Sequence, residues 1–309
     1  MKLTKRLTRY VPRSVLPYLR KGKRSVRRLR YETRQRLQPV TVDRDAVVAA
    51  LRETGLDSGD AVFFQSAMSS FGEILGGATT VVDALEEIVG EEGLLAMPAF
   101  PIVGGAVEYL SAKPVFDVRL TPSTMGAISE RFRKLPRTVR SLHPTHSVSV
   151  RGPGAERLVA GHESAATPFG VGTPFAGLIE RNAWQIWFGC GIAAFTTYHA
   201  FECLRPDFPL PVFVEQPFSA RCLDAEGREH IVETLVHDPL VSARRIDANP
   251  IIAARWRSLL LDQGVIRSVR LGRGEILSVQ MRPLMAELER LLGKGITIYD
   301  LPVPATDSR

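Results

Sequence analysis

The chain has 309 residues, 45% of them apolar, and a formal net charge of +7. This size allows one large domain, or one domain with an added lobe. No apolar run approaches the roughly 20 residues that span a bilayer, and the basic N-terminus lacks the apolar core of a secretion signal. The three cysteines show no CxxC spacing, which argues against a disulfide framework and favours a cytoplasmic protein with reduced thiols.

The positive charge is concentrated at the N-terminus. Residues 1–38 hold fourteen basic residues and one acid, so this arm carries +13, whereas residues 39–309 carry −6. Apolar residues recur there every fourth position, as in an amphipathic helix that Pro12 and Pro17 interrupt: Leu3, Leu7, Val11, Val15 and Leu19. We favour contact with the inner face of an anionic membrane. A solvated tail or a partner subunit stays open, and no motif indicates specific nucleic-acid recognition.

The body begins with alternating helix and strand signals. Residues 43–55 predict a helix capped by Asp43, and residues 60–64 predict a buried strand. A polar, glycine-rich loop then leads into a helix over 78–89. Hydroxyls, glycines and a helix start can hold phosphate, although the loop matches neither GxxxxGK[ST] nor GxGxxG and a simple turn is the alternative. The candidate contacts are Ser66, Ser69, Ser70, Gly72, Gly76 and Gly77.

Strands predicted over 93–97 and 183–189, with a helix over 124–134, continue the alternation. This order predicts an α/β fold: a layered, mostly parallel or mixed central sheet flanked by helices, with ligands at the carboxyl ends of its strands. From residue 212 the pattern changes to short strands over 212–217, 219–222 and 231–236, which predict a smaller β-rich lobe over about 211–248. Helices over 250–263 and 281–292 close a domain that we expect to cover 39–309.

Two titratable clusters are candidate active-site residues. The first is His143-Pro-Thr-His146, and the second, residues 196–202, follows a predicted strand. A neutral imidazole can accept a proton near neutral pH. The spacing of His199 and Glu202 places both on one helix face, so the carboxylate can orient the ring. Thr196 and Thr197 at the helix entrance can stabilise an oxyanion; in the alternative, Thr197 caps the helix and His199 is a core residue.

Two other chemistries stay open from the residues alone. His143, His146 and His199 would give a metal three nitrogen ligands, although no acidic ligand follows at a familiar spacing. Otherwise we expect His143 to donate to a neighbouring backbone group or to substrate. Cys190 lies between two glycines at a strand exit, where a thiol nucleophile is conceivable, whereas no GxSxG elbow indicates a serine hydrolase.

Taken together, these motifs resemble the aminoglycoside 3-N-acetyltransferase family over roughly residues 43–295. The segments that carry the resemblance agree with the family in order and spacing, and five motifs in register are specific. They are 65–77, 93–100 with its Met-Pro, 116–152 with TPSxxG, FR and RSxHPxxS, 167–174 (TPFGVGTP) and 196–202 (TTYHAFE).

The resemblance implies the antibiotic N-acetyltransferase fold and direct transfer of an acetyl group from acetyl-CoA to a primary amine, without a metal. His199 would be the general base, oriented by Glu202, and Thr197 or nearby N–H groups would stabilise the oxyanion. The Ser66–Gly77 loop would hold the CoA phosphates and pantetheine. The remaining implied contacts are Phe169, Gly172 and Thr173, which would line the cleft, and His143, Pro144 and Ser147, which would shape its floor.

The chain also departs from the family's pattern. Gln65 replaces a histidine, Phe195 an asparagine and Tyr198 a leucine, all around the acceptor and thioester. These changes favour an amino sugar or a similar biosynthetic amine over an aminoglycoside antibiotic. The competing interpretations are a non-catalytic relative that uses its basic arm on a membrane or nucleic acid, and a metal-dependent amide hydrolase. A homo-oligomer is left open.

Overall fold

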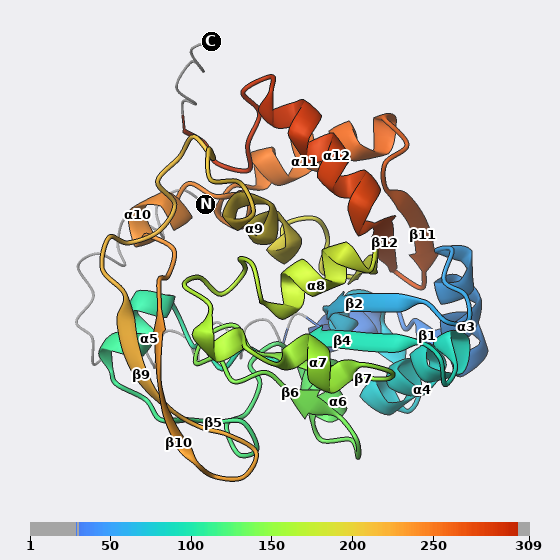
Figure 1. Ribbon diagram of the computed structural model, residues 1–309. Coiled ribbons are helices and arrows are strands. Elements are labelled where there is room, and N and C mark those ends of the chain that lie inside the picture. Colours follow the sequence, from blue (N-terminus) through green and yellow to red (C-terminus); the bar gives the residue numbers. More distant parts are fainter. Residues whose placement is uncertain (1–28, 30, 302–309) are drawn as a thin grey trace.

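The computed structural model describes residue 29 and residues 31–301, and a seven-stranded mixed sheet forms the centre of this part of the chain (Figure 1). The strands β8, β2 and β4 run parallel to one another, and antiparallel pairs complete both edges. This confirms the expected α/β class with a mixed sheet. In spatial order the strands are β11 (Arg267–Leu271), β12 (Gly274–Gln280), β8 (Trp184–Phe188), β2 (Ala61–Ser66), β4 (Leu94–Pro98), β7 (Val148–Arg151) and β6 (Val139–Arg140).

Helices cover both faces of the sheet, because side chains alternate between its faces along each strand. Phe64 and Phe188 point into the core formed with α3, α4 and α6. Trp187, the neighbour of Phe188, points into the opposite core with α9, α11 and α12. These helices are α3 (Arg44–Glu53), α4 (Gly77–Val89), α6 (Ala127–Arg133), α9 (Thr196–Cys203), α11 (Pro250–Asp262) and α12 (Met281–Leu292).

Shorter elements fill the connections. A two-stranded parallel sheet pairs β1 with β3, and α7 and α8 pack beside the β4–β7 side of the main sheet. These elements are β1 (Thr41–Val42), β3 (Glu73–Ile74), α5 (Ala106–Ser111), α7 (Ala155–Val159), α8 (Pro174–Glu180), α10 (Pro239–Ser242) and the 3₁₀ turns η2 (Met68–Ser70), η3 (His162–Ser164) and η4 (Ile246–Ala248).

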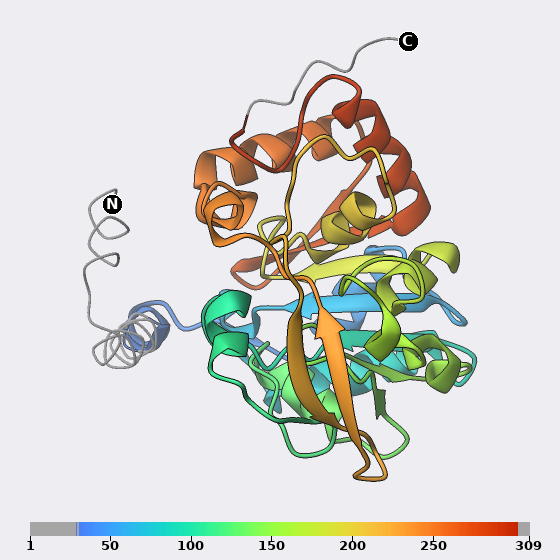
Figure 2. The same cartoon turned by 60° about the vertical axis from the view of Figure 1, so that its left-hand side comes forward.

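The expected β-rich lobe is a three-stranded sheet with its own apolar cluster, and Figure 2 shows its long hairpin standing beside the main sheet. The hairpin joins β9 (Phe218–Leu223) to β10 (Glu229–Thr234), and β5 (Phe116–Asp117) adds to β9 in parallel. The predicted strand over 212–217 is wrong, because only Phe213 makes a single bridge, to His237. Pro211 and Pro217, which lack an N–H, border this segment and interrupt a ladder.

The predicted arm lies mostly outside the described residues, and with it the amphipathic repeat from Leu3 to Leu19. Residues 31–37 are helical and lie against the body. The Tyr31 hydroxyl donates to the Gly72 carbonyl at 3.1 Å, and Arg273 Nη1 donates to the Gln38 carbonyl at 2.9 Å. Residues 31–38 therefore pack with the body. Among the described residues, no helix is long and apolar enough to cross a membrane.

The exit of β8 directs the chain toward α9. Gly189 has φ 72°, in the left-handed region that favours glycine. A Cβ at this position would lie 2.6 Å from the Phe71 ring and 2.9 Å from the Ala67 carbonyl oxygen. The sharp turn and the close packing both require glycine at this point.

Phe188→Ala tests the packing beneath this turn. The Phe188 ring is fully buried, with its centroid 5.3 Å from that of Phe64 and 4.1 Å from that of Phe71. Removing the ring leaves a cavity, so we expect the free energy of unfolding to fall by about 3–5 kcal/mol in urea denaturation. Ile251→Ala is the control, because that side chain is 76% exposed, and its change should stay within about 0.5 kcal/mol. Equal losses in the two variants would contradict the described core.

Candidate active site

Side-chain amides and hydroxyls attach the start of α9 to the central strands. Gln65 Nε2, near the end of β2, donates to Thr196 Oγ1 at 2.9 Å. Gln185 Nε2, in β8, donates to Gln65 Oε1 at 3.3 Å, and the Thr197 hydroxyl donates to Gln185 Oε1. Because these groups are buried or partly buried, their hydrogen bonds are costly to break. These hydrogen bonds therefore fix the first turn of α9 over the face of the sheet where Trp187 lies.

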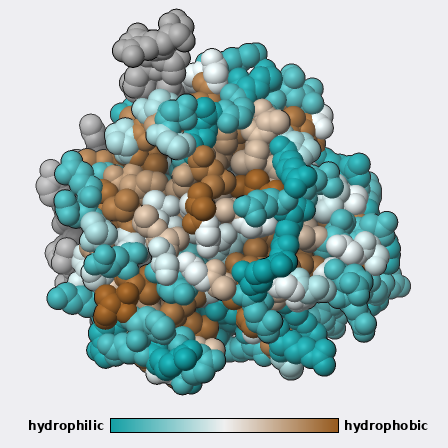
Figure 3. Space-filling model, in the orientation of Figure 1, coloured by the Kyte–Doolittle hydropathy of each residue, from teal (hydrophilic) through white to brown (hydrophobic). Residues whose placement is uncertain are grey.

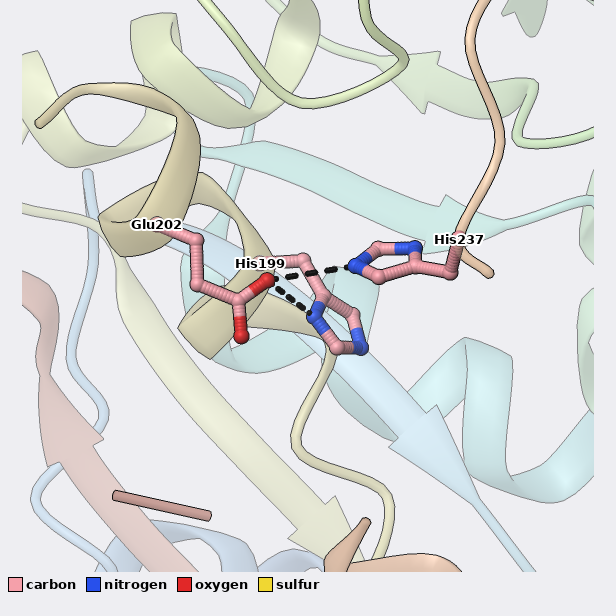
Figure 4. A group of neighbouring side chains, drawn as sticks. All are labelled: His199, Glu202 and His237. Atoms are coloured by element: carbon pink, nitrogen blue, oxygen red, sulfur yellow. Dashed lines mark hydrogen bonds and ion pairs between the residues drawn. The ribbon is translucent and has the colours of Figure 1, made fainter. Parts of the chain in front are cut away.

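The centre of the site is the carboxylate of Glu202, whose side chain has no exposed surface. Figure 4 shows two rings converging on it: His199 Nδ1 lies 2.9 Å and His237 Nε2 lies 3.2 Å from Glu202 Oε2. The Tyr299 hydroxyl donates to the other oxygen, Oε1, at 2.7 Å. The histidine and the glutamate of α9 thus share one helix face, as their spacing predicts, and two distant residues join them.

Three of the four side chains have pKa values that differ strongly from their usual ones. Burial alone would raise the pKa of Glu202, but the charges and hydrogen bonds of His199 and His237 outweigh burial and lower it to about 2. Burial lowers the pKa of His237 to about 4, helped by the charge of His199. Burial and the Glu202 charge raise the pKa of Tyr299. At neutral pH Glu202 is therefore ionised, and His237 and Tyr299 are neutral donors to it.

The hydrogen bonds of His199 define its tautomer. Its Nε2 lies 3.2 Å from Arg245 Nη1, and a guanidinium can only donate, so Nε2 is the acceptor. The proton of the neutral ring is then on Nδ1, which donates to Glu202. The His199 side chain keeps 11% of its surface exposed, so the protein does not enclose the ring completely.

Apolar rings form the wall around the two histidines. Phe169 is fully buried, and its centroid lies 5.2 Å from that of His199 and 5.8 Å from that of His237. On the other side of His237, Phe213 lies at 4.7 Å and contributes to a cavity of about 740 Å³. Figure 3 shows apolar surface in brown over this side of the molecule, where α10 and the β9–β10 hairpin lie in Figure 1. The cavity is lined by Pro211, Phe213, Val214, Glu215, Gln216, Pro217, Phe218, Asp238, Leu240 and Val241.

Thr197 is not positioned for the role expected of it. Its residue is 1% exposed, its hydroxyl is engaged with Gln185, and the N-cap position of α9 is Phe195. Thr197 therefore neither caps the helix nor offers its hydroxyl to an oxyanion. It connects the helix to the sheet.

Of the two contacts expected for His143, with a neighbouring backbone group or with substrate, the structure shows the first, although the ring accepts these bonds and does not donate them. Its Nδ1 accepts backbone N–H groups of His146 at 3.0 Å and Thr145 at 3.3 Å, and its Nε2 pairs with the Thr234 hydroxyl at 3.2 Å. Both nitrogens of this fully buried ring are engaged, so His143 is not free to ligate a metal with His146 and His199. Burial raises the pKa of Cys190 to about 12 and keeps the thiol protonated, which argues against the thiol nucleophile left open above.

In the part of the chain that the structure describes, a different group of three residues could hold a metal ion. Ligand atoms of His199, Glu202 and His237 lie within 4.8 Å of one another. Both ring nitrogens that face inward, however, direct their N–H groups at Glu202 Oε2. The carboxylate oxygen occupies the point where the donors converge, and Arg245 adds a cation beside it. The arrangement suits a positioned base better than a cation.

The predicted phosphate loop lies between the end of β2 and the start of α4. Ser70 donates its hydroxyl to the Gly189 carbonyl at 2.7 Å, and Gly72 packs against Val40. Gly76 (φ 74°) precedes the first residue of α4, and Gly77 has open space beyond its Cα. Part of the loop thus serves internal packing, while its helix start is open to a ligand. Ser66 is the last residue of β2 and Ser69 lies within η2.

In the segment 167–173, Phe169 is the residue whose ring packs against His199 and His237. Thr173 caps α8, accepting the Ala176 N–H at 3.4 Å and donating to the Gly170 carbonyl at 2.7 Å. Gly172 has φ 78° and open space around it. The Thr173 hydroxyl is therefore engaged in capping α8 and in its bond to Gly170.

The fold and this geometry can be compared with known proteins. The profile of the family described as aminoglycoside 3-N-acetyltransferase matches residues 63–293. Aminoglycoside N(3)-acetyltransferase VII of Streptomyces paromomycinus is 32% identical over 194 residues, which cover 58% of this chain and 66% of the relative, slightly less than two thirds of its length.

Solved structures share the architecture. The crystal structure of aminoglycoside acetyltransferase AAC(3)-Xa has a TM-score of 0.70 at 23% identity, covering 86% of this chain and 97% of that chain. AAC-IIIb, solved as a binary complex with CoASH, has a TM-score of 0.68 at 23% identity, covering 85% of this chain and all (100%) of that chain. At this level of identity the similarity establishes the fold.

The buried imidazoles predict an acid-sensitive fold. Burial lowers the pKa of His143 and His146 well below the usual 6.5 and that of His162 and His237 to about 4. Between pH 6.5 and 4 the unfolded chain therefore binds more protons than the native one. Stability should be fully present above pH 6.5 and fall as the pH drops, by about 1.4 kcal/mol per unit for each imidazole. Urea denaturation at pH 7, 6 and 5 measures this slope, and a flat profile would contradict it.

Proposed function

Because the chain belongs to the aminoglycoside 3-N-acetyltransferase family, we propose that it transfers an acetyl group from acetyl-CoA directly to a primary amine, with His199 as the general base. The acceptor class that we propose is an amino sugar or an aminoglycoside-like amine. Acetyl-CoA supplies the activated thioester carbonyl. The protein supplies the base, its orientation and the positioning of the acceptor.

One observation carries this proposal: the two nitrogens of His199 have different surroundings. Nδ1 donates to a fully buried, ionised carboxylate, whereas the Nε2 lone pair faces the Arg245 guanidinium, and the side chain keeps 11% of its surface exposed. A carboxylate that orients an imidazole in this way also stabilises the imidazolium that forms when Nε2 takes a proton. His237 and Tyr299 hold the same carboxylate in place from two other sides.

The proposed steps follow from this arrangement. His199 Nε2 accepts a proton from the amine as the amine nitrogen attacks the carbonyl carbon, and Glu202 balances the positive charge on the ring. The same Nε2–H then protonates the departing sulfur. An alkylammonium must lose a proton before it can attack, so a base beside the acceptor is required.

The open start of α4 supports the proposed CoA site. A helix N-terminus presents unpaired N–H groups that favour phosphate, and Gly77, the first residue of α4, has open space beyond its Cα. Ser66 is the last residue of β2. The CoA phosphates would lie toward α4 and the thioester toward His199.

The 740 Å³ cavity beside His237 supports an acceptor subsite. Its wall combines apolar side chains with Glu215 and Asp238, and two carboxylates in an apolar surround suit an amine with a partly apolar ring. The modest number of carboxylates favours a compact amine over a large polycation. A cytoplasmic location, with membrane contact through residues 1–38, remains part of the proposal and rests on composition alone.

His199→Ala tests the base. We expect the rate of acetyl transfer, followed by thiol release across amino sugars, nucleotide-linked amino sugars and aminoglycosides, to fall by about 100-fold or more. The KM for acetyl-CoA should change little, because the ring contacts the reacting amine. His230→Ala is the control, since that imidazole pairs with Asp224 in the lobe and is 40% exposed. Parental rates in His199→Ala would remove the ring from the mechanism.

Cofactor and metal binding separate the competing functions. The transferase should show a rise in Tm with acetyl-CoA, by mass action on a binding cleft, and should retain full activity after dialysis against EDTA. A stoichiometric bound metal whose removal abolishes activity would favour the amide hydrolase, with His199, Glu202 and His237 as ligands. A chain that gives neither a Tm shift with acetyl-CoA nor turnover would favour the non-catalytic relative.

A further inference from the structure

Arg245 lies directly on the reacting nitrogen of the proposed base. Its Nη1 is 3.2 Å from His199 Nε2, although the two residues are 46 positions apart in the chain. The other two nitrogens of the guanidinium bind one carboxylate: Nε donates to Asp247 Oδ1 at 2.9 Å and Nη2 to Asp247 Oδ2 at 3.2 Å. This clamp fixes the plane of the guanidinium and leaves Nη1 directed at the ring.

The contact with Nε2 cannot persist during the reaction. The lone pair that Arg245 occupies is the one that must receive the proton of the amine. When the amine displaces this contact, the clamp to Asp247 still holds the guanidinium in place, and Nη1 then has its N–H groups free beside the reacting atoms. Arg245 side-chain exposure is 21%, so the released donor stays partly desolvated, where its electrostatic effect is strong.

The transition state needs such a donor. Negative charge develops on the carbonyl oxygen as the amine attacks, and an effective donor lies about 2.7–3.1 Å from that oxygen. The amine nitrogen lies about 3 Å from Nε2, and the oxygen is bonded to the carbon under attack. An Nη1 atom 3.2 Å from Nε2 is therefore within reach of that oxygen.

Three other polar side chains at this point already donate to other groups. The Thr197 hydroxyl donates to Gln185, the Tyr299 hydroxyl to Glu202 Oε1, and His237 Nε2 to Glu202 Oε2. Among these neighbours and Arg245, only the guanidinium combines a positive charge with a donor directed at the Nε2 of His199. Thr197 therefore does not stabilise the oxyanion as the sequence predicts, and Arg245 is positioned to do so.

We propose that Arg245 is a catalytic residue that stabilises the oxyanion of acetyl transfer; this inference rests on the proposed function. The amine lone pair forms the new C–N bond, the carbonyl π pair moves onto oxygen beside Nη1, and the amine proton passes to His199 Nε2. On collapse the C=O bond re-forms, the C–S bond breaks, and the sulfur leaves with that proton. Arg245 gains and loses no atom.

Charged groups around Arg245 agree with this role. Asp247 balances its charge in the resting site, so the cation is retained without a net positive field that would repel an amine. Burial lowers the pKa of Arg245, but the hydrogen bond and charge of Asp247 outweigh this, and the net direction is upward. The guanidinium therefore stays charged throughout the reaction.

Arg245→Gln and Arg245→Lys test the proposal in steady-state kinetics. We expect kcat in Arg245→Gln to fall by about 10²–10³-fold, with the KM for acetyl-CoA nearly unchanged. Arg245→Lys should recover part of the loss, because it restores the charge. Added guanidinium should partly rescue Arg245→Ala, which a merely structural role would not allow.

Arg205→Gln is the matched control. Arg205 also forms a two-nitrogen clamp with the aspartate two residues on, Asp207, at 3.2 and 3.0 Å, and is 24% exposed. Its described partners, Asp207, Glu289 and the Phe201 ring, do not include His199. We expect this variant to keep kcat near that of the parent. Losses of equal size in the two glutamine variants would indicate general destabilisation and overturn the assignment.

A second readout avoids the unknown acceptor. Slow hydrolysis of acetyl-CoA passes through the same kind of oxyanion with water as the nucleophile, so it should fall in Arg245→Gln as transfer does. If the parent protein turns over and Arg245→Gln equals or exceeds it, the role of Arg245 is overturned while the proposed function stands. If the parent neither transfers nor hydrolyses, the proposed function fails and this inference fails with it.

Discussion

The buried charge of Glu202 is the constraint on which the site depends. A carboxylate without exposed surface is stable only when its oxygens are paired, and here three donors from three separate segments provide the partners: His199 on α9, His237 beyond β10, and Tyr299 after α12. Satisfying one charge therefore brings distant parts of the chain together. It also fixes the ring of His199 in the tautomer that leaves Nε2 as a base.

The sheet provides the second level of organisation. The parallel strands β2 and β8 end side by side, and the pair Gln65 and Gln185 attaches the first turn of α9 to them. These bonds hold α9 on the sheet face where Trp187 lies. The polar residues that hold the helix are engaged in this attachment. Thr197 is an example, since its hydroxyl donates to Gln185 and secures α9.

Local patterns predict the parts of this protein that depend on neighbours in the chain. The helices α3, α4, α6, α11 and α12 carry caps or apolar periodicity, and the pair His199 and Glu202 follows from helical spacing. His237, Arg245 and Tyr299 lie 35 to 97 residues from their partners in α9, in short or irregular segments where no periodicity marks a side chain as functional. The strands β11 and β12 were not predicted, although the sequence contains a pattern typical of a β-hairpin: Val269 and Leu271 alternate with polar residues before the turn at Gly272.

The contact between Tyr299 and Glu202 has a consequence for the order in which the protein matures. A ribosome delivers the chain from its N-terminus, so the sheet and α9 emerge well before residue 299. Until that tyrosine arrives, the buried carboxylate lacks one of its donors and the pocket around His199 is incomplete. Fragments that end after α12 but before Tyr299 would therefore lack the complete set of donors around Glu202.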